Sequence, residues 1–327
     1  MFGYWSFYAL LLGALIDAVA GDPHWLPHPV KLIGKLISLL EGRLRRVFPK
    51  SARGENLAGG VRWVIVVALA FLIPAALLML CHHLSHWIGL AVESVMCWQC
   101  LAARSLVSES MKVKKALDSG EIAASRNAVA MIVGRDTERL DEAGVARAAV
   151  ETVAENTSDG VIAPLLFLSI GGGPLGMLYK AVNTMDSMLG YIEPPYRHFG
   201  LVPAKLDDVF NFIPARLSAL LMLVGGGILG FDMKNGLRIF RRDRSKHASP
   251  NSAQTESVMA GLLGLRLAGD AWYHGALHKK EFIGDPLREI ENEDIARANR
   301  IMYMTAALAL LLFGGLKLVV LVTTYAL

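Results

Sequence analysis

The stretch Trp63-Val-Ile-Val-Val-Ala-Leu-Ala-Phe-Leu-Ile-Pro74-Ala-Ala-Leu-Leu-Met-Leu80 decides the fold class of this chain. It contains no charged side chain, and its length approaches the roughly 20 apolar residues that cross a bilayer as a helix. A helix pairs every backbone N–H and C=O group internally, which hydrocarbon requires because it contains no water. The stretch therefore predicts a membrane-spanning helix that is interrupted at Pro74.

Other apolar stretches lie on both sides of it, and hydrophobic residues make up 54% of the 327 residues. The clearest stretches are 4–20, 63–80, 209–231 and 301–326, and the weaker ones are 84–103 and 161–178. We expect an all-α, polytopic helical membrane protein of about five spans. We also expect large helical interface or cytoplasmic segments at 104–155 and 234–299, and no persistent strands. No linker separates two halves, so the sequence predicts a single integral membrane domain over 1–327.

The first apolar stretch, 4–20, lacks a charged leader and a small-residue cleavage site. A secretory signal peptide carries both features. We therefore expect this stretch to be retained as a span.

Lysine and arginine residues gather between the apolar stretches, mainly at 31–53 and 238–246. Such residues accumulate on the cytoplasmic side of membrane spans. If both runs and 104–147 lie inside, 84–103 and 161–178 must both cross, and 180–208 then lies outside. A re-entrant segment broken at Gly171-Gly172-Gly173-Pro174 would change the number of crossings, so the topology stays open.

The basic runs accompany a net charge of +4. No base-stacking pattern or nucleic-acid motif comes with them, so we expect membrane lipid or an anionic ligand as partner and no nucleic acid. The chain has three cysteines, which excludes a disulfide framework for a protein of this length.

An acidic segment, Glu151-Thr-Val-Ala-Glu155-Asn156-Thr-Ser-Asp159-Gly160, precedes the apolar run that begins at Val161. Side chains four residues apart share a helix face, so Glu151, Glu155 and Asp159 can converge. Like charges at this spacing repel one another, and a divalent cation or a positively charged ligand offsets the repulsion. The alternative is a solvated helix end that stops at Gly160.

A proline-rich loop, Gly21-Asp22-Pro23-His24-Trp25-Leu26-Pro27-His28-Pro29, follows the first apolar stretch. Its prolines disfavour helix and hold Asp22 and His28 on a stiff loop at the membrane interface. Loops of this kind often position ligand groups. The alternative is a structural corner with an interfacial tryptophan anchor.

A later segment places Lys180, Asn183 and Asp186 at helical spacing, and therefore on one helix face. A cation, an amide and a carboxylate in or beside lipid are energetically expensive and usually functional. The segment is thus a candidate binding surface.

A second polar segment begins with Asp207 and Asp208 and continues to Asn211 and Arg216. Carboxylate oxygens can bind Mg²⁺ while a guanidinium holds a phosphate group with two hydrogen bonds. The alternative is the capped start of the following span, with Asp208 as the cap.

A polar turn, His247-Ala-Ser249-Pro250-Asn251-Ser252, leads into another apolar helix. Hydroxyl and amide groups at a helix N-terminus can cradle an anion, which makes Ser249 and Asn251 candidate phosphate ligands. Ordinary turn chemistry explains the same residues without a ligand.

These segments resemble the CobD/CbiB family, the membrane adenosylcobinamide-phosphate synthases of cobalamin biosynthesis. The matching blocks follow the family order from about residue 17 to about residue 270: Gly21-Asp22-Pro23 with His28-Pro29-Val30, Glu151 to Gly160 with Pro164-Leu-Leu-Phe167, Lys180 to Tyr191, Asp207 to Leu217, and Ser249-Pro250-Asn251 with Met259-Ala-Gly261. The chain departs from the family pattern at Ser252-Ala-Gln, where small residues such as Ala-Gly are expected.

The resemblance implies an ATP-dependent amide ligation. A carboxylate of adenosylcobyric acid is joined to aminopropanol phosphate, or to aminopropanol or a related amino alcohol, giving adenosylcobinamide phosphate. The carboxylate must first be activated, typically as an acyl phosphate, and phosphoryl transfer from ATP needs Mg²⁺ and cationic groups. The resemblance also implies a multi-pass protein of the cell (inner) membrane, and it leaves room for contacts with other late membrane enzymes of the pathway and for a homo-oligomer.

The candidate residues fall into three roles under this hypothesis. The metal ligands are sought among Glu151, Glu155, Asp159, Asp207 and Asp208. The substrate and phosphate ligands are sought among Lys180, Asn183, Asn211, Arg216, Ser249 and Asn251. The group that takes the ammonium proton is sought among Asp22, His28 and Asp186.

Two other functional classes share some of these features. A Mg²⁺-dependent membrane transferase acting on a lipid or isoprenoid phosphate would also present acidic helix ends to a metal, but the Ala-Arg and repeated Asp expected after Asp159-Gly160 are missing. A non-catalytic corrinoid-binding membrane scaffold would use the intramembrane polar groups for docking. ATP consumption that depends on both substrates would distinguish the ligase from both alternatives.

Overall fold

The computed structural model describes residues 3–23, 25–190, 196–273 and 275–325. The helices are α1 (Gly3–Ala20), α2 (Pro29–Val47), α3 (Ala52–Leu84), α4 (His86–Cys100), α5 (Ala103–Asp118), α6 (Ile122–Ala130), α7 (Glu142–Asn156), the π-helical turn η1 (Thr157–Ile162), α8 (Ala163–Leu189), α9 (Leu201–Ile228), α10 (Met233–Asp243), α11 (Ser252–Leu263) and α12 (Glu293–Tyr325). Four short strands lie between α11 and α12: β1 (Leu267–Ala268), β2 (Ala271–Tyr273), β3 (Ala276–His278) and β4 (Phe282–Ile283).

Within these described residues, six helical segments are long and apolar enough to cross a membrane. They are Gly3–Ala20, Ala52–Leu84, His86–Asp118, Glu142–Leu189, Leu201–Ile228 and Glu293–Thr324. Each overlaps one of the apolar stretches selected from the sequence, including the weaker stretches 84–103 and 161–178. The all-α, multi-pass membrane fold is therefore confirmed, and the expected number of about five spans is one fewer than these six helices.

The residues form two compact units by their internal contacts. Unit 1 combines Met1–Ala102, Ala163–Asn211 and Leu312–Leu327, and unit 2 combines Ala103–Ile162 and Phe212–Leu311. Unit 1 contains α1 to α4, α8, the beginning of α9 and the end of α12. Unit 2 contains α5 to α7, η1, the rest of α9, α10, α11, the strands and the beginning of α12. The single integral membrane domain over 1–327 that the sequence suggests stays a prediction.

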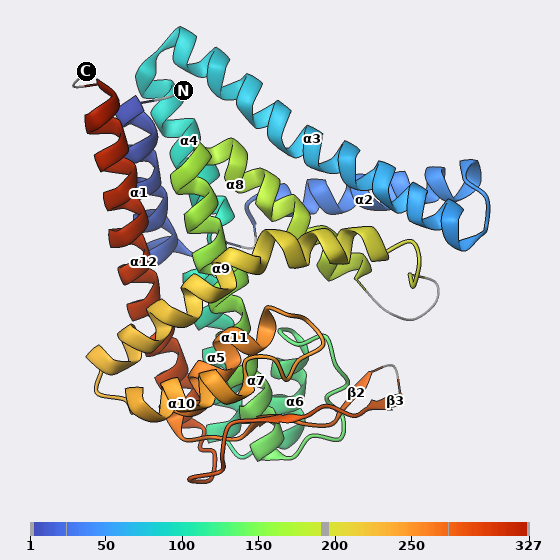
Figure 1. Ribbon diagram of the computed structural model, residues 1–327, viewed down its shortest axis with the longest axis vertical. Coiled ribbons are helices and arrows are strands. Elements are labelled where there is room, and N and C mark those ends of the chain that lie inside the picture. The colour runs from blue at the N-terminus through green and yellow to red at the C-terminus, as the bar shows by residue number, and fades with distance from the viewer. Residues whose placement is uncertain (1–2, 24, 191–195, 274, 326–327) are drawn as a thin grey trace. The chain divides into compact units, whose positions relative to one another are not determined.

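In unit 1, α2 packs along the first half of α3, and both helices contact α8 (Figure 1). Their common core includes Ile37 from α2, Val66 from α3, and Val182 and Met185 from α8. His28 is the N-cap residue of α2, and its Nδ1 accepts a hydrogen bond from the Val30 N–H at 3.2 Å. The N-terminus of α2 therefore fixes the orientation of the His28 imidazole.

Helix α8 is broken inside its glycine run, as the sequence predicted. Gly172 has a φ of +65°, a left-handed conformation that glycine adopts without steric penalty. The N–H of Gly173 donates to Oε1 of Glu93 at 3.2 Å, and the Ser6 hydroxyl donates to the same oxygen at 2.7 Å. Nζ of Lys317 donates to Oγ of Ser6 at 3.0 Å. A buried carboxylate from α4 thus pairs with backbone that the break exposes.

Unit 2 departs from the expected pattern, since we predicted helix across 234–299. β1 pairs with β4 and β2 pairs with β3, both antiparallel. Helix α11 ends because Gly264 adopts a left-handed φ of +66° as its C-cap. Gly275, with a φ of +78°, lies in the turn between β2 and β3.

The break in α8 generates a stability prediction. A Cβ atom on Gly172 would lie 2.2 Å from Oε1 of Glu93. We expect Gly172→Ala to destabilise the protein by about 1–2 kcal/mol from its left-handed backbone alone, and further by displacing the carboxylate. Thermal unfolding of the detergent-purified protein measures the loss.

The matched control is Gly315→Ala, because a Cβ at Gly315 meets nothing within 4 Å. Since Gly315 lies inside α12, where alanine is the better helix former, its midpoint should equal or exceed that of the unmodified protein. If Gly172→Ala and Gly315→Ala unfold at the same temperature, the left-handed backbone at Gly172 and its contact with Glu93 do not contribute to stability as proposed.

Candidate functional site

Unit 2 gathers three carboxylates, Glu151 and Glu155 from α7 and Glu256 from α11, which we call the acidic cluster. Glu151 and Glu155 share a helix face, as their four-residue spacing predicted. Glu256 lies close enough to both that each of their charges raises its pKa. The cluster therefore joins two segments about 100 residues apart in the sequence.

Glu151 is fully engaged within unit 2. Arg135 Nη2 donates to its Oε2 at 2.6 Å, and the Ala268 N–H donates to its Oε1 at 2.7 Å. Ala268 has a φ of +58°, which is strained for a residue with a Cβ atom. Strained backbone persists where surrounding contacts enforce it, and it concentrates at functional sites. Glu151 therefore supplies part of the contact that enforces this conformation.

Glu256 has a different environment. Its residue is 6% exposed, and its Oε2 has no hydrogen-bond partner among the residues that the structure describes. Burial raises the pKa of Glu256 well above its usual range, and the nearby charges of Glu155 and Glu151 raise it further. A buried carboxylate in such surroundings is either protonated or neutralised by a cation. The site therefore suits a divalent cation or an ammonium group.

Glu155 connects the acidic cluster to the predicted phosphate-binding turn. Its Oε1 accepts a hydrogen bond from the Ser252 hydroxyl at 2.9 Å. Ser252 directly follows Asn251 and is the first residue of α11. Burial lowers the pKa of His247, and the charge of Glu155 opposes that shift. The acidic cluster and the turn at 247–252 therefore form one polar site within unit 2.

Three of the predicted phosphate ligands meet in this turn. Nη1 of Arg216 donates to Oδ1 of Asn251 at 3.3 Å and to the Phe212 carbonyl at 2.7 Å. The Asn251 N–H donates to Oγ of Ser249 at 3.2 Å. Asn251 is the N-cap residue of α11, but its side chain does not cap the helix. A guanidinium beside a helix N-terminus favours an anion.

The metal ligands sought from the sequence, Glu151, Glu155 and Asp159 with Asp207 or Asp208, are divided between the two units. Among the described residues, no group of three or more His, Cys, Asp or Glu side chains has the arrangement of a metal site. Asp159 lies in η1, where π-helical geometry changes the α-helical spacing that would align it with Glu155. Asp207 and Asp208 belong to unit 1. Their roles as metal ligands stay predictions.

Three other predicted residues meet in unit 1. Nε2 of His28 lies 3.8 Å from Oδ1 of Asp22, and the charge of Lys180 acts on the same imidazole. Burial lowers the pKa of His28 most, Asp22 opposes the shift, and Lys180 adds to it. His28 is therefore largely neutral at pH 7, and Asp22 is the acidic neighbour that the sequence did not identify for it.

The remaining predicted residues occupy α8 and α9. Asn211 is buried, donates to Oδ2 of Asp207 at 2.9 Å and accepts from the Tyr179 hydroxyl at 2.7 Å. Oδ2 of Asp208 lies 3.9 Å from Nζ of Lys205. These contacts explain Asp207 and Asn211 as parts of a network that joins α8 to α9.

Asn183 and Asp186 are half-buried on the same helix as Lys180. The main-chain carbonyl of Asp186 accepts a hydrogen bond from the Gly190 N–H at 2.7 Å. The ligand-binding role of Asn183 and the base role of Asp186 stay predictions.

Comparison with known proteins supplies independent evidence. Residues 10–302 match the family model described as "CobD/Cbib protein". "Cobalamin biosynthesis protein CobD" of Klebsiella pneumoniae is 47% identical over 304 residues, covering 93% of this chain and 95% of the relative. The protein of the same name from Clostridium perfringens is 44% identical over 301 residues, with 92% and 95% covered. "Cobalamin biosynthesis protein CbiB" of Salmonella typhimurium is 45% identical over 298 residues, with 91% and 93% covered. No solved structure matches the chain.

Glu256 generates a prediction with a defined pH dependence. Because folding raises its pKa, the stability that it contributes is present below the unfolded pKa of about 4.3 and is lost as pH rises. Glu256→Gln removes this loss, so we expect its thermal midpoint to exceed that of the unmodified protein at pH 8 and to differ little at pH 5. The measurement is made with a chelator present, since a bound cation would offset the repulsion.

Glu289→Gln is the matched control, because Glu289 is exposed. It should leave the midpoint unchanged at both pH values. A Glu256→Gln variant that is equally destabilised at pH 5 and pH 8 would argue against a repulsive acidic cluster.

Proposed function

We propose, because this chain belongs to the CobD/CbiB family, that it acts in cobalamin biosynthesis as an adenosylcobinamide-phosphate synthase. The reaction would be an ATP-dependent ligation of adenosylcobyric acid with aminopropanol phosphate or aminopropanol. The enzyme would be a multi-pass protein of the cell inner membrane. The names of the relatives support the pathway, and the polar sites described above support the reaction.

The proposed chemistry has two steps. An oxygen of the adenosylcobyric acid carboxylate attacks the γ-phosphorus of ATP, which forms an acyl phosphate and releases ADP. The neutral amine of the amino alcohol then attacks the acyl carbon, the amide bond forms, and inorganic phosphate leaves. One proton must leave the ammonium group before or during the attack, so a base is required.

The unpartnered Oε2 of Glu256, buried beside Glu155 and Glu151, is the observation that carries this proposal. Carboxylate oxygens are the ligands that Mg²⁺ prefers, and a cation would offset the repulsion within the acidic cluster. We therefore assign Mg²⁺ to Glu155 and Glu256, with Glu151 held aside by Arg135. When bound, Mg²⁺ would neutralise charge on the phosphoryl oxygens of ATP.

The turn beside the acidic cluster supplies the proposed phosphate contacts. Arg216 provides positive charge, and Ser249 and Asn251 provide hydroxyl and amide groups at the start of α11. Since Ser252 joins this turn to Glu155, metal and phosphate ligands would lie in the same unit. This arrangement fits the way phosphate oxygens bridge a metal ion and cationic side chains.

The proposed base is His28, with Asp22 beside its Nε2. A neutral imidazole can take a proton, and the nearby carboxylate stabilises the imidazolium that forms. Lys180, which lowers the pKa of His28, is the proposed ligand for an anionic group of the substrate. The partners would thus be the corrinoid acid, the amino alcohol phosphate, ATP and the surrounding lipid.

The proposal is tested with the full chain purified in detergent. Adenosylcobyric acid, ATP, Mg²⁺ and aminopropanol phosphate should give adenosylcobinamide phosphate by mass spectrometry, with sustained ADP production over many turnovers only when both other substrates are present. Glu155→Gln and Glu256→Gln should each lower kcat/KM by about 100-fold or more, because each removes charge that stabilises the phosphoryl-transfer transition state.

Glu289→Gln is again the control and should retain full activity. Near-normal rates for Glu155→Gln in correctly expressed protein would exclude the metal assignment. A lipid-linked product would indicate the transferase class, and substrate binding without turnover would indicate a scaffold.

The role of His28 is tested by His28→Asn. Asparagine is a good N-cap residue, so the start of α2 should be preserved while the base is lost. We expect kcat to fall by about 10²–10⁴-fold with a small change in KM. In the unmodified protein kcat should fall as pH drops below the lowered pKa of His28, because protonation removes the base. An unchanged low-pH limb in the His28→Asn variant would rule out this assignment.

A further inference from the structure

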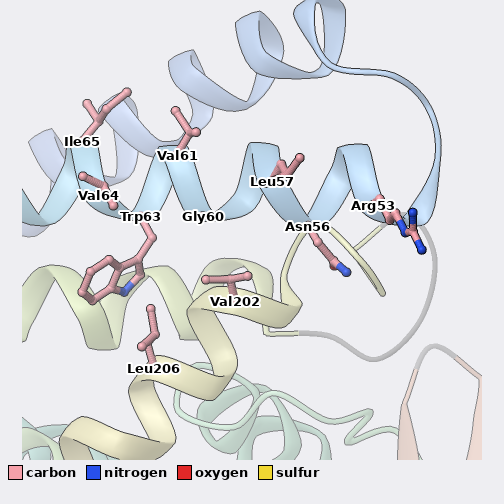
Figure 2. A pocket seen from close by; sticks show the side chains of 10 residues that line it. All are labelled: Arg53, Asn56, Leu57, Gly60, Val61, Trp63, Val64, Ile65, Val202 and Leu206. Atoms are coloured by element: carbon pink, nitrogen blue, oxygen red, sulfur yellow. The ribbon is translucent and has the colours of Figure 1, made fainter.

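An apolar pocket of about 870 Å³ lies in unit 1, between the first half of α3 and the beginning of α9 (Figure 2). Its volume falls within the range of about 300–1,000 Å³ that is usual for ligand sites. Apolar side chains form most of the wall, including Leu57, Val61 and Val64 from α3 and Val202 and Leu206 from α9. The proposed ligation uses none of these residues.

Three polar residues interrupt this lining. Arg53 is exposed at one end of the pocket and forms no ion pair within the described part of the chain. Oδ1 of Asn56 and Nε1 of Trp63 are buried, and neither has a hydrogen-bond partner among the described residues. Figure 2 shows both side chains directed from α3 toward the segment that carries Val202 and Leu206. Both atoms are shielded by protein, so Arg53 is the one of these three residues that offers a ligand an accessible polar group.

The position of the pocket along α3 indicates membrane-interface depth. The apolar run of α3 begins at Trp63, and Arg53 precedes it by about three helical turns. Tryptophan and arginine at such a boundary are typical of the headgroup region. The lining therefore changes from cationic to apolar in the direction of hydrocarbon.

The surrounding segment is strongly basic. Between residues 29 and 53 the acidic residue is Glu41, and the basic residues are Lys31, Lys35, Arg43, Arg45, Arg46, Lys50 and Arg53. Basic residues near a membrane surface attract anionic lipid headgroups. Charge complementarity therefore favours an anionic amphiphile over a neutral lipid.

We propose that this pocket binds one anionic phospholipid, such as phosphatidylglycerol. Arg53 would pair with the phosphate. An acyl chain would lie against the apolar wall, which includes Leu57, Val64 and Leu206.

Two adjacent glycines provide a way to test this site. A Cβ on Gly59 would lie 2.4 Å from the Phe199 carbonyl oxygen, so Gly59 is required for packing. A Cβ on Gly60 would meet only Val202 Cγ1, at 4.0 Å, and Gly60 lines the pocket. Gly60→Leu can therefore fill the pocket without displacing backbone. Gly315→Leu is the matched control, because Gly315 is also helical and has open space around its Cβ position.

Native mass spectrometry of the full chain in detergent measures the binding of phosphatidylglycerol and of phosphatidylcholine with identical acyl chains. We expect the unmodified protein and Gly315→Leu to retain phosphatidylglycerol preferentially. Gly60→Leu should abolish retention, and Arg53→Gln should weaken phosphatidylglycerol binding by about fivefold, the effect of roughly one basic residue near anionic lipid.

Equal retention of the two lipids by the unmodified protein would overturn the proposal. So would a Gly60→Leu variant that retains phosphatidylglycerol normally, or one whose main effect is a changed ratio of dimer to monomer, which would identify a second copy of the chain as the occupant. If Gly60→Leu fails to fold, the exposed Arg53→Gln variant decides the question: loss of the lipid preference supports the site, and an unchanged preference refutes it.

Discussion

The carboxylate of Glu93 is the interaction on which unit 1 depends, because it pairs with the backbone of α8 where that helix is broken. An unpaired N–H group in hydrocarbon would destabilise the fold by several kcal/mol. The Ser6 hydroxyl binds the same carboxylate oxygen, so α1, α4 and α8 are joined at one point. The part of α8 after the break carries Tyr179 and Lys180, and their positions therefore depend on this buried contact.

Two buried carboxylates of unit 2, Asp243 and Glu256, have opposite pKa shifts. Burial alone would raise the pKa of Asp243, but hydrogen bonds from Arg242, Lys246 and the Gly284 N–H lower it overall. For Glu256, burial raises the pKa, the charges of Glu155 and Glu151 raise it further, and the opposing charges of Lys280 and Arg135 do not reverse the shift. The chain thus surrounds one buried acid with hydrogen-bond donors, whereas Oε2 of the other has no hydrogen-bond partner among the described residues. Carboxylates whose pKa is strongly perturbed by burial and by nearby charges are most common at functional sites.

The sequence predicts those features that depend on residues close together along the chain. Apolar length identifies the spans, the glycine run identifies the break in α8, and four-residue spacing places Glu151 beside Glu155. The stretch 84–103 looks like a weak membrane span in the sequence because it contains polar residues. In the structure these residues have hydrogen-bond partners far away in the sequence: Glu93 accepts from Ser6, and the Gln99 amide donates to the Pro27 carbonyl. Glu256 could not be selected as a site residue from the sequence either, because the carboxylates that surround it, Glu151 and Glu155, lie about 100 residues earlier. The strands, two or three residues long, are too short for alternation to be visible.

Helix α3 is 33 residues long and therefore about 50 Å in length, whereas the hydrocarbon core is about 30 Å thick. Tilts of membrane helices reach about 40°, and at that angle α3 would still rise about 38 Å along the bilayer normal. Its N-terminal turns must then project beyond the hydrocarbon at any ordinary tilt. Bilayers that differ by a few ångströms in thickness can be matched by immersing more or less of this one helix, so α3 gives the protein tolerance to hydrophobic mismatch.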